Sequence, residues 1–127
     1  MKEIIATGKA PQAIGPYSQG IKVSCSQMIF CSGQVAIDPA TKKIVGTTAA
    51  EQCQQVMKNL SEVLRSAGVG FSSVVKTTVY LSDFNDFSAV NEVYATFFEK
   101  NPPARATVQA ARLPLEAKVE IDAIAVV

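Results

Sequence analysis

The side chains that could do chemistry in this 127-residue chain are limited by one absence, because the sequence contains no histidine. The absence excludes Ser-His-Asp and Cys-His nucleophilic catalysis, the His-containing metalloprotease motifs and most zinc chemistry. It also removes the side chain that normally titrates near neutral pH. Acid–base work must therefore fall to Glu, Asp, Tyr, Lys, Cys or water.

Arg105 is the first candidate for binding a substrate. It follows Pro102-Pro103-Ala104 and comes just ahead of a predicted strand. Proline stiffens the approach to this residue, and a guanidinium held in place offers a planar fork that binds a carboxylate through two parallel hydrogen bonds. An ordinary surface ion pair with a structural acid is the alternative at this point.

Glu120 is the candidate proton acceptor. It lies on a predicted strand whose adjacent residues, Val119 and Ile121, point to the other face. A carboxylate on a well-packed strand loses water and becomes a usable general base. A solvated strand face or a salt bridge between subunits would explain the same pattern.

Two turns could shape a binding site around these residues. Gly15-Pro16 fixes a turn and presents Tyr17 in a defined direction. Ser32-Gly33-Gln34 follows a strand, and Gly33 permits a close approach of the backbone to a ligand. Taken alone, each pattern is equally typical of a surface turn or a strand-end bulge.

The elements that must position these residues include two predicted helices. The first covers residues 47–67: Thr48 and Glu51 form a capping box, Gly68 is the stop, and an apolar stripe follows the helical period. The members of this stripe are Cys53, Val56, Met57, Leu60, Val63, Leu64 and Ala67.

The second predicted helix runs from Phe87 to Glu99, with Asp86 as its cap and Pro102-Pro103 as its end. Asn91 lies about one turn beyond Phe87, so both can face the same neighbour. The apolar face comprises Phe87, Val90, Tyr94, Phe97 and Phe98.

Strand patterns fill the remainder of the sequence. They cover Val74–Leu81, Val119–Val127, Met28–Cys31 and Ile21–Val23, with weaker signals at Ile4–Ile5 and Thr107–Ala110. The order of the elements predicts a single α+β domain over residues 1–127, with both helices on one face of a sheet.

The other face of that sheet would carry Lys76, Thr78, Glu120 and Asp122 among apolar neighbours. This mixture is too polar for the core of a monomer and too apolar for a face that is fully exposed to solvent. A closed symmetric assembly of identical sheets would cover it. We therefore expect a homo-oligomer, with function at the joints between subunits.

The net charge, the hydropathy and the cysteine count limit the classes of partner and the cellular compartment to be expected. The net charge is +1 and the basic residues are scattered, which argues against nucleic acid. No apolar run approaches the length of a membrane span, and the N-terminus has no secretory pattern. The odd count of three cysteines favours a reducing cytoplasm over a disulfide framework.

Taken together, these blocks resemble the RidA (YjgF/YER057c/UK114) family of reactive intermediate imine deaminases over nearly the whole chain. The most specific part runs from Arg105 to Glu120. The matching blocks are residues 14–19, 32–34, 75–79, 85–87 with 90–91, 103–105, 113–114 and 119–121. A cysteine often found two places after the arginine is Thr107 here, which puts thiol-based regulation in doubt.

The resemblance implies a chorismate-mutase-like fold, a mixed β-sheet with two helices packed on one face, assembled as a homotrimer with clefts between subunits. It implies hydrolysis of 2-iminobutanoate and 2-iminopropanoate, which pyridoxal-phosphate-dependent dehydratases release, without metal or organic cofactor. Arg105 would bind the substrate carboxylate, Glu120 would activate water, and Tyr17 or a backbone amide near Gly33 would steady the reacting centre. Ser32, Gly33, Phe87, Asn91 and Thr107 would line the cleft.

Three other functions remain open from the residues. A non-catalytic regulatory protein could bind 2-keto acids in the same cleft. Family members are also described as translation inhibitors or ribonucleases, against which the even charge and the absence of histidine argue. A holdase-like interaction protein is the fourth possibility. The deaminase is the leading hypothesis.

Overall fold

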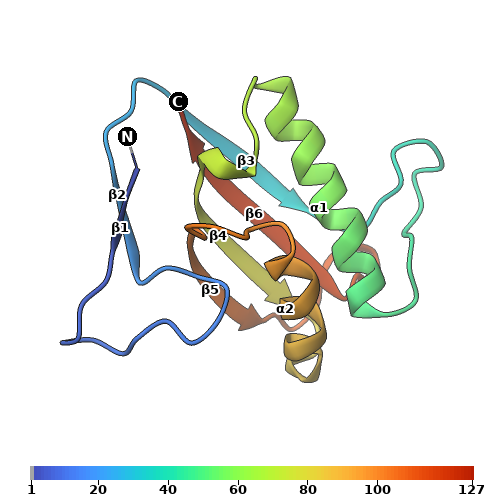
Figure 1. Ribbon diagram of the computed structural model, residues 1–127. Helices are drawn as coiled ribbons and strands as arrows, with labels where there is room; N and C mark the ends of the chain where they lie inside the picture. Colours follow the sequence, from blue (N-terminus) through green and yellow to red (C-terminus); the bar gives the residue numbers. More distant parts are fainter. Residues whose placement is uncertain (1) are drawn as a thin grey trace.

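A four-stranded mixed sheet forms the centre of the computed structural model, which describes residues 2–127 (Figure 1). Its strand order is β3 (Met28–Gln34), β6 (Val119–Val126), β4 (Val74–Leu81) and β5 (Ala104–Gln109). β6 pairs antiparallel with both β3 and β4, whereas β4 and β5 are parallel. The arrangement confirms the predicted α+β class.

Both helices, α1 (Ala49–Ser66) and α2 (Phe87–Ala95), cover the same face of this sheet, as predicted (Figure 1). Parallel strands cannot be joined by a tight hairpin and need a crossover. α2 lies in the crossover from β4 to its parallel neighbour β5. The connection therefore places α2 beside the start of β5, where Arg105 lies.

The capping box of α1 is present as predicted. The Thr48 side chain accepts a hydrogen bond from the Glu51 amide, and the Glu51 carboxylate accepts one from the Thr48 amide. The buried stripe contains Cys53, Val56, Met57, Leu60 and Leu64. Two expected members, Val63 and Ala67, are exposed instead. They occupy the margin of the stripe and the end of the helix, where the sheet no longer covers them.

α2 begins at Phe87 with Asp86 at its N-cap position, as predicted, but the cap lacks its side-chain hydrogen bond and the helix ends earlier. Asp86 occupies the N-cap position without a side-chain cap, because the chain enters the helix from the 3-10 turn Phe84–Asp86. The helix ends at Ala95 instead of Glu99, since the Thr96 hydroxyl and amide both bond the Val93 carbonyl. The apolar face is nevertheless correct: Val90, Tyr94 and Phe98 are buried and the other two phenylalanines pack on the core.

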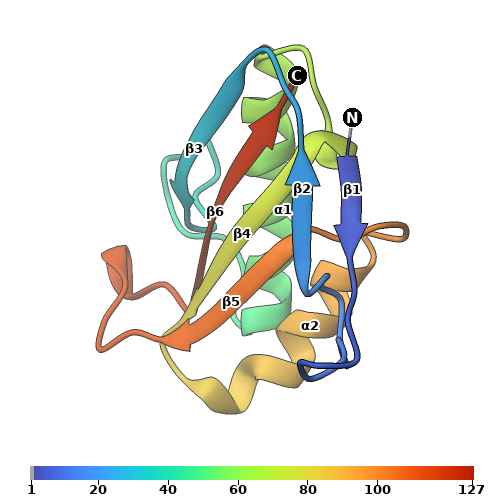
Figure 2. The same ribbon diagram turned by 90° about the vertical axis from the view of Figure 1, so that its left-hand side faces the viewer.

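The strands match their predictions in place, with shifted ends. β3 extends three residues beyond Cys31, and β5 begins at Ala104 instead of Thr107. The antiparallel hairpin of β1 (Lys2–Ile5) and β2 (Gly20–Val23) forms a separate sheet, which stands beyond β5 in Figure 2. The Lys2 ammonium group secures it by donating to the carbonyls of Val74 and Asn101 at 3.2 and 3.1 Å.

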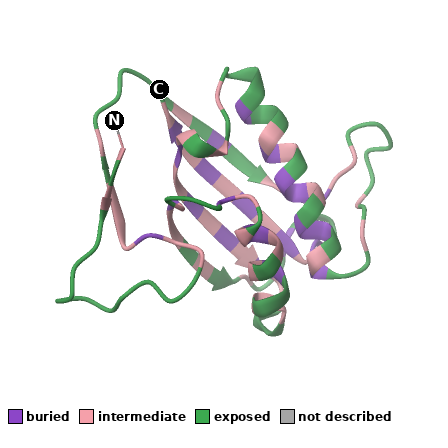
Figure 3. Cartoon of the chain, viewed as in Figure 1, coloured by how far each residue is buried: buried purple, intermediate pink, exposed green. Residues whose placement is uncertain are grey.

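The side of the sheet away from the helices is here called the open face, and Figure 2 looks onto it. Burial alternates along β4 and β6, with the helix side buried and the open face half-buried (Figure 3). Two apolar residues of β3 are strongly exposed on the open face, Phe30 at 70% and Met28 at 55%. Its other members are Lys76, Thr78, Tyr80, Glu120, Asp122, Ile124 and Val126. The predicted mixture of polar and apolar side chains is therefore present.

No helix within residues 2–127 is long and apolar enough to cross a membrane.

Candidate functional site

Arg105 is the second residue of β5 and projects to the helix side of the sheet. It pairs with Thr77, whose buried hydroxyl lies 2.7 Å from the Tyr94 hydroxyl of α2. Partners in adjacent strands point to the same face, so the guanidinium faces α2. The expectation that Arg105 precedes the strand is wrong, because pairing with β4 already begins at Ala104.

Three aromatic rings surround the guanidinium. Its central carbon lies 5.0 Å from the ring centroid of Tyr94, 5.6 Å from that of Tyr17 and 5.8 Å from that of Phe87. These distances are those of cation–π contacts. The Asn91 side-chain oxygen accepts a hydrogen bond from Nη1 at 2.5 Å. The structure therefore brings Tyr17, Phe87 and Asn91, three of the residues expected to line the cleft, to Arg105.

Local sequence explains how these side chains converge. Phe87, Asn91 and Tyr94 are spaced at i, i+4 and i+7, which puts them on one stripe of α2. Tyr17 comes from the opposite direction, on a turn where its amide donates to the Gly15 carbonyl at 2.8 Å. Ser18 then bonds the carbonyls of Pro102 and Pro103, directly before β5. That junction holds the Tyr17 ring against the guanidinium.

The guanidinium has no carboxylate partner within residues 2–127. Burial lowers the pKa of Arg105 below its usual range, while the nearby Tyr94 and Tyr17 oppose that shift. A guanidinium remains charged even so. Burying part of a cation without an anion is unfavourable. The arrangement therefore offers a planar hydrogen-bonding fork between flat apolar walls, which is chemically suited to pairing with an external anion.

Tyr94 is a core residue, as the sequence interpretation assigned it, and its ring also contacts the Arg105 guanidinium, which that interpretation did not anticipate. Its ring centroid lies nearer the guanidinium carbon than either predicted ring. Burial raises the pKa of Tyr94 to about 12, so its hydroxyl stays protonated. The signal was available, because Tyr94 follows the predicted site residues Phe87 and Asn91 on the same helical stripe.

Glu120 belongs to the open face. It pairs with Tyr80 in β4, whereas the inward neighbours Val119 and Ile121 are fully buried. On the other side, β3 bulges between Cys31 and Gln34, and this bulge holds Ser32 and Gly33. The end of the Glu120 side chain lies against Gly33. Glu120 and Gly33 are thus in contact, and Ser32 lies beside Gly33 in the same bulge.

Within one protomer, however, the two groups lie on opposite faces of the sheet. Arg105 pairs with Thr77 and Glu120 pairs with Tyr80. Positions an odd number of residues apart in a regular strand point to opposite faces, and β4 is regular from Lys76 to Leu81. A site that contains both residues therefore requires more than one copy of the chain.

Thr107 follows Arg105 on the same face of β5, opposite Val79. Its hydroxyl oxygen is buried and has no hydrogen-bond partner within residues 2–127. The Thr107 side chain thus lies on the same face as Arg105, and its hydroxyl is available to hydrogen-bond a ligand.

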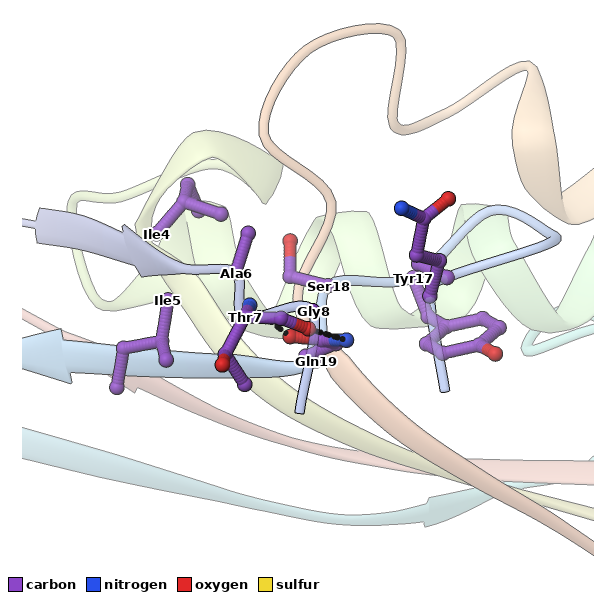
Figure 4. Close-up of a pocket in the computed structure, with 10 residues that line it drawn as sticks. Ile4, Ile5, Ala6, Thr7, Gly8, Tyr17, Ser18 and Gln19 are labelled. Carbon is purple, nitrogen blue, oxygen red and sulfur yellow. Dashed lines mark hydrogen bonds between the residues drawn. The ribbon is translucent and has the colours of Figure 1, made fainter. Parts of the chain in front are cut away.

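A hollow of about 360 Å³ adjoins Tyr17, between the β1–β2 hairpin and its connecting loop (Figure 4). Ile4, Ile5 and Ala13 contribute its apolar wall. Gln19 stabilises the loop by accepting from the Thr7 amide and donating to the Pro11 carbonyl, both at 2.6 Å. Neither Arg105 nor Glu120 lines this hollow. It is therefore a neighbour of the arginine group and separate from it.

Comparison with known proteins identifies the family. The profile of the family described as Endoribonuclease L-PSP matches residues 7–127. The chain belongs to this family. A protein from Myxococcus xanthus, DfrA, is 50% identical over 125 residues, which are 98% of this chain and 95% of that protein. The mouse 2-iminobutanoate/2-iminopropanoate deaminase is also 50% identical, over 99% of this chain and 92% of that protein.

Solved structures agree with this assignment. A Yersinia pestis member of the conserved Rid protein family, YyfA, superimposes with a TM-score of 0.77 at 42% identity and covers 100% of both chains. The predicted membership of the RidA group of the Endoribonuclease L-PSP family is thus confirmed.

Proposed function

We propose that this chain hydrolyses reactive 2-imino acids, such as 2-iminobutanoate and 2-iminopropanoate, to 2-keto acids and ammonia. The single observation that carries the proposal is the half-buried guanidinium of Arg105, which lies among three aromatic rings and has no carboxylate partner within residues 2–127. A small 2-imino acid supplies the missing anion through its carboxylate. The full-length relationship to the mouse deaminase supports the same activity.

The chemistry suits a protein without histidine. A protonated imine is already electrophilic, so water adds to its carbon and forms a carbinolamine, while a base takes the proton from the water. The base then returns this proton to the nitrogen of the carbinolamine, the carbon–nitrogen bond breaks to release ammonia, and the hydroxyl loses its proton to the base as the carbon–oxygen bond becomes the carbonyl of the keto acid. Such a reaction needs orientation and a proton acceptor, and no covalent intermediate.

In this mechanism Arg105 anchors the substrate and Glu120 receives the proton. Tyr17, or a backbone amide near Gly33, steadies the polar centre that develops at the former imine carbon. Phe87 and Asn91 line the arginine side of the cleft, and Thr107 contributes its unused hydroxyl there. Ser32 and Gly33 line the glutamate side.

We further propose that the chain assembles as a homotrimer of chorismate-mutase-like protomers, with a cleft at each joint. Within one protomer the register of the sheet keeps Arg105 and Glu120 on opposite faces. Assembly would bring the Glu120 group of one protomer to the Arg105 group of its neighbour. It would also cover the exposed Phe30 and Met28.

The proposed setting is the cytoplasm, next to pyridoxal-phosphate-dependent dehydratases that release 2-imino acids. All three cysteines are free thiols, which suits a reducing compartment. Small 2-imino and 2-keto acids are the proposed ligands, with no nucleic acid, membrane or cofactor as partner.

The test is a coupled assay in which a threonine dehydratase generates the imine and the formation of keto acid is measured. Semicarbazide in the same assay traps the imine that remains free. Wild-type protein is expected to reduce semicarbazone formation, and Arg105→Ala to lose that effect by at least 100-fold while remaining folded. Arg112→Ala is the matched control, because Arg112 is exposed and paired with Glu116 on the surface. Full activity of Arg105→Ala would refute the anchoring role.

The same proteins distinguish the competing functions. A 2-keto acid sensor would bind 2-ketobutanoate in calorimetry without accelerating imine loss. The family's name, Endoribonuclease L-PSP, favours a ribonuclease as the second candidate. An RNA-cleaving activity that survives further purification, and is retained in Arg105→Ala, would support that candidate instead.

A further inference from the structure

Gly33 occupies a position where the backbone itself does not demand glycine. It lies in the bulge of β3, where the pairing jumps from Cys31 opposite Ala123 to Gln34 opposite Ile121. The glycines with positive φ are Gly46 and Gly68, so Gly33 is outside the left-handed region. Conformational freedom is one reason for a glycine, and close approach of another group is the other. Only the second applies here.

The group that approaches Gly33 is the carboxylate of Glu120. A Cβ atom added to Gly33 would overlap Oε2 of Glu120 and would lie 2.9 Å from its Cδ and 3.1 Å from its Cγ. The whole end of the glutamate side chain is thus packed over the glycine. By contrast, a Cβ at Gly8 or Gly70 would meet no atom within 4 Å. The Glu120 side chain therefore occupies the space that a side chain at position 33 would need.

No hydrogen bond or ion pair holds the Glu120 carboxylate within the described part of the chain. On the β4 side, its cross-strand neighbour Tyr80 donates its hydroxyl to Asp122 at 3.2 Å. Packing against the bulge is then what sets the direction of the carboxylate. A side chain with several rotatable bonds and no polar partner is redirected when its space is removed.

We propose that Gly33 is a positioning residue for Glu120: the absent side chain lets the carboxylate lie against the bulge, in the place from which it receives a proton from water. This inference rests on the imine hydrolysis proposed above, and it adds a role for the glycine that a backbone contact with the ligand does not provide. Misplacing a general base by about 1 Å costs on the order of 100-fold in rate.

The first test is Gly33→Ala in the imine assay. We expect kcat to fall at least tenfold while KM and the affinity for 2-ketobutanoate stay within twofold, since Arg105 still anchors the carboxylate. Gly8→Ala and Gly70→Ala are matched controls and should retain wild-type kcat and KM.

The second test is a double-mutant cycle with Glu120→Asp, which shortens the side chain by one methylene group. Without the longer side chain to displace, Gly33→Ala should change kcat less than twofold in that background. If Gly33→Ala alone fails to fold, combination with Glu120→Asp should restore its Tm. An equal loss of kcat in both backgrounds, or an unfolded double variant, would overturn the positioning role.

Two other results would also contradict the inference. One is wild-type kcat in Gly33→Ala. The other is a rise in KM and in the 2-ketobutanoate Kd with kcat unchanged, which would mean that Gly33 acts by touching the ligand. Absence of imine hydrolysis in the wild-type protein would refute the proposed function without testing the contact between Gly33 and Glu120. In that case a crystal structure of Gly33→Ala decides the packing claim, which requires a displaced Glu120 carboxylate.

Discussion

At the scale of single residues, β5 carries two polar groups that residues 2–127 leave without a full set of partners. The Arg105 cation is half-buried beside one amide oxygen and three rings, and the Thr107 hydroxyl two residues later is buried with no hydrogen-bond partner among those residues. Both lie on the same face of the same edge strand. Unsatisfied buried groups reduce stability, so their presence together supports the proposed role of this strand in ligand binding.

Thr107→Val should therefore raise stability while impairing function. Replacing a buried hydroxyl that has no partner by a methyl group removes a desolvation cost of about 1 kcal/mol. We expect the free energy of unfolding in urea to rise by that order, and kcat/KM for the imine to fall several-fold. The contrast is Thr77→Val, which orphans the Tyr94 hydroxyl and should destabilise by about 1–3 kcal/mol. A destabilised Thr107→Val would contradict this account.

At the scale of secondary-structure elements, the site depends on a crossover. α2 connects two parallel strands, and its stripe of Phe87, Asn91 and Tyr94 comes to rest against the arginine that begins the second strand. α1 contributes no ligand-facing residue. It buries the stripe from Cys53 to Leu64 against the sheet and thereby holds the core on which α2 packs.

The capping box of α1 permits a direct measurement of what that element contributes. Thr48→Ala removes the hydroxyl that accepts from the Glu51 amide, and we expect a loss of about 1 kcal/mol in unfolding free energy. Thr47→Ala is the control, because it keeps the backbone amide that donates to Glu51. Imine hydrolysis should be unchanged in both, as neither residue touches the site. An effect of Thr47→Ala equal to that of Thr48→Ala would argue against the cap.

The effect of Thr48→Ala should also depend on pH. The Thr48 and Thr47 amides, and then the Thr48 hydroxyl, hold the pKa of the Glu51 carboxyl below its ordinary value of 4.5. A carboxyl whose pKa is lowered by folding stabilises fully above its unfolded pKa and loses that contribution as pH falls through its folded pKa. The Tm difference between wild type and Thr48→Ala should therefore shrink as pH falls from 6 to below 4.5.

At the scale of the whole molecule, the open face of a single chain leaves large apolar side chains exposed to solvent. Phe30 and Met28 are exposed beside Ile124 and Val126, and the other side chains of this face, including Glu120, carry polar groups. A surface of this kind suits contact with another copy, with an apolar part that drives association and a polar part that faces a cleft.

Phe30→Glu should accordingly dissociate the assembly. A charge placed on the apolar part of the open face is expected to give a protomer-sized mass in light scattering and to abolish imine hydrolysis, because each proposed site needs two chains. Val63→Glu, on the exposed side of α1, is the matched control and should keep mass and activity. A monomeric but fully active Phe30→Glu protein would show that the open face is not part of the site.

Local patterns were sufficient to predict the elements and to select the candidate residues, but not their division between the two faces of the sheet. A capping box, a helical stripe and alternation along a strand each depend on neighbours within a few positions, so Thr48, the Cys53–Leu64 stripe and the outward direction of Glu120 could be read directly. Pairing between distant strands decided the remainder. The register put Arg105 and Glu120 on opposite faces, and the bulge of β3 laid Gly33 against a carboxylate 87 positions away. Such contacts depend on sheet register and crossover geometry, which no short stretch of sequence encodes.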